Sequence, residues 1–130
     1  MISGLAALSL LAAACGGHGG HAHAHGSPGG ARPPVRGARE IPIEARSFAF
    51  SPSEIHITAG ESVNLSLTAV DILHDLTVVG LATHLVAETT RSAIGGLTVP
   101  QRAGRYAFVC TVPGHREAGM VGVLVVDSPT

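Results

Sequence analysis

The 130-residue sequence has no tryptophan, one tyrosine and three phenylalanines, and only 13% of its residues are charged. Its formal net charge is −1, and lysines or arginines form no run anywhere. A nucleic-acid-binding surface needs clustered basic side chains, so this composition excludes a nucleic-acid role. Stretches with the period of a helix are also lacking, and the length leaves room for one domain after a leader.

Cysteine is scarce as well, with only Cys15 and Cys110 in the chain. A disulfide between them would join a leader to the far end of the domain, and each cysteine has a better separate explanation. We therefore expect the fold to be stabilised by its core rather than by cross-links.

Residues 1–15 predict a signal peptide. The apolar stretch from Ile2 to Ala14 has the length of a secretory signal and is too short to span a bilayer. The small residues before Cys15 resemble a bacterial lipoprotein signal, in which that cysteine is acylated and begins the mature protein. The alternative is plain secretion with Cys15 removed. In both cases we expect an exported protein, in the periplasm or on the outer face of the membrane, with membrane contact through the lipid if Cys15 is acylated.

Residues 16–40 are predicted to form a flexible linker, because Gly, His, Ala, Pro and Arg dominate it and cannot bury much apolar surface. Neutral imidazoles are common metal ligands, so four of its histidines could bind a metal weakly. These are His18, His21, His23 and His25. The alternative is a polar linker whose histidines bind metal only incidentally.

Residues 41–130 are predicted to form an all-β domain. Apolar residues alternate with polar ones, most regularly from Val63 to Ala69, and 17 glycines and eight prolines supply turns. The segment 81–93 lacks strong alternation and is expected to hold a loop or a short helix. About seven or eight short strands in this length indicate a Greek-key β-sandwich. The expected strands cover residues 41–45, 48–50, 55–57, 63–69, 76–79, 97–99, 105–110 and 121–126.

A thiol, an imidazole and a thioether lie on one predicted loop, at Cys110, His115 and Met120. Two soft sulfur ligands with a nitrogen ligand favour copper over hard cations. Pro113 fixes one backbone torsion and Gly114 permits a tight bend, so the loop can direct all three side chains to one point.

A trigonal copper site also needs a second histidine, and His74 fits best because it lies at a strand end where loops gather. Taken singly, each of these residues could be ordinary: a buried thiol, a core methionine, a hydrogen-bonded loop histidine. Together they predict a site for one copper ion. No second cysteine lies near Cys110, which excludes a binuclear copper centre.

The loop Cys-Thr-Val-Pro-Gly-His, with methionine five residues after the histidine, resembles the copper loop of the cupredoxins, the blue (type 1) copper proteins, especially auracyanin and rusticyanin. The stretch Phe48-Ala49-Phe50-Ser51-Pro52 resembles their opening strands, and the likeness extends over residues 41–126. The resemblance implies that both histidines bind through ring nitrogens, the cysteine as a short thiolate and the methionine as a weak axial ligand.

Asp75 follows His74 where several relatives have Asn or Ser. The resemblance implies that Asp75 ties the two ligand loops together, and its carboxylate would favour oxidised copper. The pattern places His56 on the outward face of a strand, in solvent, and gives His84 no role.

With four protein ligands no position stays open for a substrate, so we expect a one-electron carrier rather than an enzyme. A monomer would dock briefly with redox partner proteins near His115, over the small residues Pro113, Gly114, Ala118 and Gly119. The main alternative is a periplasmic copper chaperone or copper buffer, with the linker histidines as the entry point.

Overall fold

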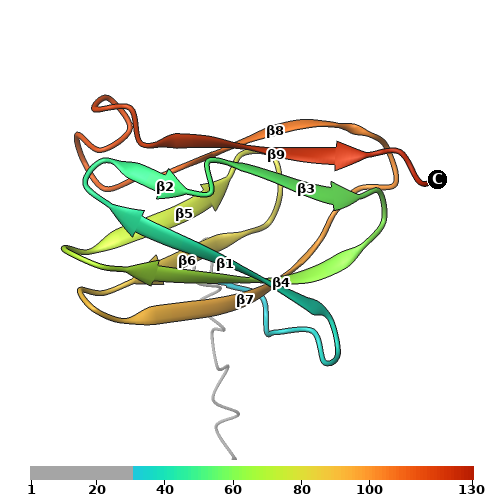
Figure 1. Cartoon of the computed structure of the whole chain (residues 1–130), viewed down its shortest axis with the longest axis horizontal. Coiled ribbons are helices and arrows are strands. Elements are labelled where there is room, and N and C mark those ends of the chain that lie inside the picture. Colours follow the sequence, from blue (N-terminus) through green and yellow to red (C-terminus); the bar gives the residue numbers. More distant parts are fainter. Residues whose placement is uncertain (1–30) are drawn as a thin grey trace, which may run out of the picture.

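The computed structural model describes residues 31–130, which form nine β-strands in two sheets (Figure 1). The expected all-β sandwich is confirmed. None of the residues described forms a helix, so none supplies a helix able to cross a membrane. The strands are β1 (Arg39–Arg46), β2 (Ala49–Ser51), β3 (Glu54–Thr58), β4 (Ser62–Ala69), β5 (His74–Val78), β6 (His84–Ala87), β7 (Ser92–Thr98), β8 (Gly104–Val109) and β9 (Val121–Asp127).

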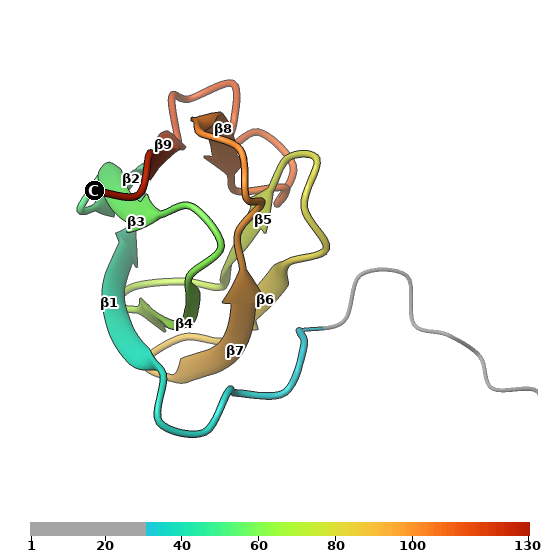
Figure 2. The same cartoon turned by 90° about the vertical axis from the view of Figure 1, so that its right-hand side faces the viewer.

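One sheet has the order β2-β1-β4-β7 and the other the order β3-β9-β8-β5-β6. The pairs β1–β4 and β3–β9 are parallel, and the other pairs are antiparallel. The view turned by 90° shows the two sheets facing each other around the core (Figure 2). Val63, Leu65 and Leu67 are at most 1% exposed, as their alternation predicted. Burying each such side chain stabilises the fold by about 1.5–3 kcal/mol.

The prediction of a loop or short helix in residues 81–93 is wrong. This segment holds β6 and the start of β7, which raises the strand count to nine. β6 is a four-residue strand at the edge of its sheet, and only Leu85 and Ala87 of it are buried. Two buried residues are too few for period-two alternation to stand out from a loop.

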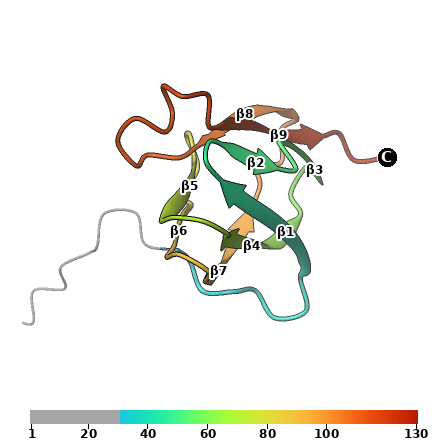
Figure 3. The same cartoon turned by 60° about the vertical axis from the view of Figure 1, so that its left-hand side comes forward.

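The last part of the predicted linker packs on the outer face of β4 and β7. The Gly96 N–H donates to the Arg32 carbonyl at 3.0 Å, and the Asn64 side chain bonds both the N–H and the carbonyl of Val35, at 2.7 and 2.9 Å. A Cβ at Gly96 would lie 2.6 Å from a carbonyl oxygen of this segment, so the close approach requires glycine. Figure 3 shows the segment crossing beneath these strands.

Five predicted residues fall outside the described part of the chain, and their roles stay predictions. They are the lipidation candidate Cys15 and the linker histidines His18, His21, His23 and His25.

His56 lies in solvent on β3, with its side chain 57% exposed, between two carboxylates. Its Nδ1 is 2.9 Å from Asp127 and its Nε2 is 3.1 Å from Glu54, and these contacts, Asp127 first, raise the pKa of His56. The folded state therefore binds this proton more tightly than the unfolded state. The resulting stability is fully present below the unfolded pKa of about 6.5 and is lost as the pH rises through the folded value.

We expect His56→Gln to flatten the pH dependence of the urea midpoint between about pH 5.5 and 8. The variant should unfold more easily than the parent at the acidic end, and the difference should shrink at the alkaline end. A difference that is constant across this range would contradict the assignment.

Candidate metal centre

Two loops bring the predicted ligands together at one end of the sandwich (Figure 1). His74 opens β5, Cys110 directly follows β8, and His115 lies on the connection to β9. One ligand atom from each of these residues lies within 4.8 Å of the others. His74 and Cys110 are 0% exposed and His115 is 7% exposed, so the ligand atoms converge in a buried space.

The loop from Cys110 to Met120 is closed by its own backbone. The Cys110 N–H donates to the Met120 carbonyl at 3.2 Å, and the Met120 N–H donates to the His115 carbonyl at 3.0 Å. Gly114 and Gly119 have φ values of 85° and 99°, where residues with a side chain are strained. These turns bring Met120 back beside Cys110, with the Met120 side chain fully buried.

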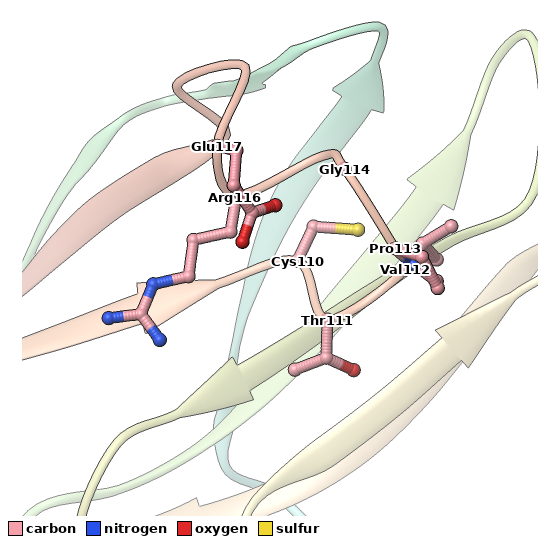
Figure 4. Close-up of a pocket in the computed structure, with 7 residues that line it drawn as sticks. All are labelled: Cys110, Thr111, Val112, Pro113, Gly114, Arg116 and Glu117. Carbon is pink, nitrogen blue, oxygen red and sulfur yellow. The ribbon is translucent and has the colours of Figure 1, made fainter.

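The Cys110 sulfur points into the space that the loop encloses, while the Arg116 guanidinium points away from it (Figure 4). The sulfur lies 3.5 Å from His115 Nδ1 and accepts a hydrogen bond from the Asp75 N–H, also at 3.5 Å. Burial, the largest cause, raises the pKa of the Cys110 thiol. The metal-free protein therefore keeps this thiol protonated, and metal binding must release the proton.

Of the two nitrogens of the His74 ring, one has a hydrogen-bond partner and the other has none. Nε2 lies 2.7 Å from the Asp71 carboxylate, whereas Nδ1 is buried with no hydrogen-bond partner. Leaving a buried polar atom unpaired costs about 1–3 kcal/mol, a cost that a metal bond removes. A free imidazole nitrogen, a second imidazole, a thiol and a buried thioether form a donor set that fits copper.

Asp71 contacts a predicted ligand, and the sequence did not identify it as part of the site. Its carboxylate accepts hydrogen bonds from the Ser47 N–H at 2.7 Å and the Ile72 N–H at 2.8 Å, besides its contact with His74. These bonds, the one from Ser47 first, hold the pKa of Asp71 well below its usual range. An ionised carboxylate on one ring nitrogen fixes the tautomer and orientation of a ligand histidine. The signal available in the sequence was an acidic residue three positions before the histidine.

We expect Asp71→Ala to weaken copper(II) binding by about 10- to 100-fold, because His74 loses the group that orients it. Asp71→Asn keeps a hydrogen-bond acceptor without the charge, so its loss should be smaller. Competition with a chelator of known affinity measures both. Equal affinity in the parent and Asp71→Ala would contradict this role.

The surface next to His115 differs from the expected ring of small residues. The Phe48 ring packs edge-on against the His115 ring with centroids 5.0 Å apart, and Phe48 itself is 46% exposed. Ile72 and Leu73, in the loop before His74, are each 43% exposed. Pro113, Gly114, Ala118 and Gly119 are exposed as expected. The rim of the site therefore includes large apolar side chains from two other loops.

Asp75 lies between the two ligand loops. Its carboxylate accepts hydrogen bonds from the backbone N–H and the hydroxyl of Thr111, the residue after Cys110. A contact with His84 was not foreseen from the sequence.

Comparison with known proteins agrees with this geometry. The profile of the family described as "Copper binding proteins, plastocyanin/azurin family" matches residues 38–127. The chain is 32% identical, over 83% of its length and 79% of the relative's, to the "Copper-resistant cuproprotein CopI" of Rubrivivax gelatinosus.

Solved structures share the fold, among them the two described next. The blue copper protein auracyanin A of Chloroflexus aurantiacus superposes with a TM-score of 0.61 at 23% identity, over 70% of this chain and all of that one. The periplasmic domain of cytochrome oxidase subunit II from Bradyrhizobium japonicum superposes with a TM-score of 0.60 at 11% identity, over 69% of this chain and 84% of that one. With a matching family profile over most of the chain and a buried donor set suited to copper, the protein belongs to the copper-binding plastocyanin/azurin family.

Proposed function

We propose that the protein is a mononuclear blue (type 1) copper protein that carries one electron at a time between partner proteins outside the cytoplasm. The proposed ligands are His74, Cys110, His115 and Met120. The observation that carries the proposal is the convergence of a buried thiol and two buried imidazoles within 4.8 Å, with a buried methionine on the loop that carries Cys110 and His115.

Copper, when bound, supplies the redox chemistry by alternating between two oxidation states. The chain orients the ligands through hydrogen bonds: Asp71 contacts the His74 ring, and backbone hydrogen bonds close the loop from Cys110 to Met120. A site that changes little between oxidation states lets the electron move with little rearrangement. Four protein ligands leave no place for a substrate, which supports a carrier rather than an enzyme.

A second candidate function is copper handling, as a chaperone or buffer. It is supported by the 32% identical relative, which is named as a copper-resistant cuproprotein. A carrier must keep its copper through many redox cycles, whereas a chaperone or buffer must release copper(I) to a client.

Challenging the reduced, copper-loaded protein with a copper(I) chelator separates the two functions. A carrier should keep its copper over many oxidation and reduction cycles and recover its full visible spectrum each time. Loss of copper to the chelator within minutes, without unfolding, would favour copper handling.

We also propose that the protein is exported and anchored by a lipid on Cys15. The apolar segment before that cysteine and the periplasmic setting of the cytochrome oxidase domain with the same fold support an extracytoplasmic location. Mass spectrometry of the mature N-terminus tests the anchor, since an unmodified terminus after Cys15 would exclude it.

We propose that the protein is a monomer and that it exchanges electrons through the surface next to His115. We expect Ala118→Glu to slow electron self-exchange between copper(I) and copper(II) copies by about tenfold or more, because like charges meet when two copies dock through this surface. Line broadening in NMR spectra of mixed redox states measures the rate. Ser128→Glu adds the same charge beyond β9, at the opposite end of the sandwich (Figure 1), and should leave the rate nearly unchanged. Equal rates in both variants would place docking elsewhere.

A further inference from the structure

We propose that His84 is a positioning residue of the copper site, acting through Asp75 on the contact between the two ligand loops. This inference rests on the blue-copper function proposed above. It concerns a histidine on the edge strand β6, away from the four proposed ligands.

The sheet register places Asp75 between two neighbours on the outer face of β5. On one side, Thr77 pairs with His84 of β6, so His84 approaches Asp75 diagonally across the sheet. On the other side, Thr77 pairs with Val109 of β8, and Thr111 follows two residues later. Asp75 therefore joins the edge strand to the loop that carries Cys110.

The contacts follow this placement. His84 Nε2 lies 3.1 Å from Asp75 Oδ2, the same oxygen that accepts the Thr111 hydroxyl, while Oδ1 accepts the Thr111 N–H. A carboxylate only accepts, so His84 Nε2 carries the proton. The Asp75 side chain is 8% exposed and that of His84 is 31% exposed. Within residues 31–130, His84 is the only basic side chain in an ion-pair contact with Asp75.

Asp75 in turn touches the copper site at two points. It directly follows His74, and its N–H donates to the Cys110 sulfur at 3.5 Å. A buried carboxylate that loses a hydrogen-bond donor has its negative charge less well compensated and gains freedom to move. More negative charge beside the site favours copper(II) over copper(I) and lowers the reduction potential.

The experiment measures the reduction potential of the copper-loaded protein in His84→Leu and His84→Gln, each in the parent and in the Asp75→Asn background. We expect His84→Leu to lower the potential by about 30–60 mV, a three- to tenfold change in the ratio of copper(II) to copper(I) affinity. The amide N–H of His84→Gln should restore at least half of the shift. In the Asp75→Asn background the His84→Leu shift should fall below a third of its size.

Hydrogen exchange of the Thr111 amide in the copper-free protein gives a second readout. It should be at least threefold faster in His84→Leu than in the parent, and close to the parent in His84→Gln. Ile94→Ala, on β7 of the other sheet and 45% exposed, should leave the potential and the exchange rate unchanged. If His84→Leu does not fold, His84→Asn replaces it, because its shorter side chain cannot reach Asp75.

An unchanged potential in His84→Leu, or the same shift with and without Asp75, would overturn the proposal. Failure of the function itself looks different: the parent would then lack a blue-copper spectrum. The Thr111 exchange rates would still decide whether His84 holds Asp75 in place, because they need no copper.

Discussion

Replacing Cys110 with serine is expected to abolish the intense visible band of the copper-loaded protein. That band arises from charge transfer between a thiolate and copper(II), and a serine hydroxyl supplies neither the soft sulfur nor, at neutral pH, a negative charge. The narrow copper hyperfine splitting should disappear from the electron paramagnetic resonance spectrum as well. Because a ligand is lost, copper(I) affinity should fall by more than about 100-fold, the upper end of the cost of losing a partner of a ligand.

The chain supplies its own matched control in its second cysteine. In protein produced without export, which keeps Cys15 unmodified, Cys15→Ser makes the same chemical change outside the proposed site, and the visible spectrum should remain that of the parent. A weak copper spectrum without the intense band, unchanged in Cys110→Ser, would mean that copper binds at another site. The linker histidines would then be the main candidates for its ligands. Copper handling would then replace electron transfer as the leading function.

The features that could be predicted from the sequence are those encoded locally. The alternation from Val63 to Ala69 marks a strand with one face in the core, and the structure buries Val63, Leu65, Leu67 and Ala69. The spacing of Cys110, His115 and Met120 around a Pro-Gly bend likewise marks a loop that folds back on itself. His74 was placed by its position at a strand end, and its ligand atom lies with those of Cys110 and His115.

The features that escaped prediction depend on contacts between distant segments. Phe48 reaches His115 from 67 positions away, and Asp75 meets Thr111 from 36 positions away. His84 acquires its partner only because β6 pairs with β5, and β6 was itself hidden by its shortness. No local period carries such information, because the strand order of the sheet decides which outer-face residues become neighbours.

The same dependence on distant contacts makes Phe108→Ala the most destabilising substitution that we predict. Phe108 is 1% exposed and packs edge-on against Phe50, with ring centroids 5.2 Å apart. Its ring also covers Gly122, its partner on β9, where a Cβ would come within 2.1 Å of the ring. Removing the ring leaves a cavity between the sheets, so we expect the free energy of unfolding of the copper-free protein to fall by about 3–5 kcal/mol. Urea unfolding measures the loss.

Phe48→Ala is the matched control, because it removes the same ring from a site that is 46% exposed. The loss there should be about 1 kcal/mol, since much of that ring is already in water. Its effect should fall instead on the copper spectrum and potential, because it uncovers His115. A typical domain is stable by only about 5–15 kcal/mol, so Phe108→Ala removes a large fraction of the free energy of unfolding. Phe108→Leu is a milder substitution that should still fold. Equal losses in Phe108→Ala and Phe48→Ala would mean that the contact between Phe108 and Phe50 is not what holds the two sheets together at this position.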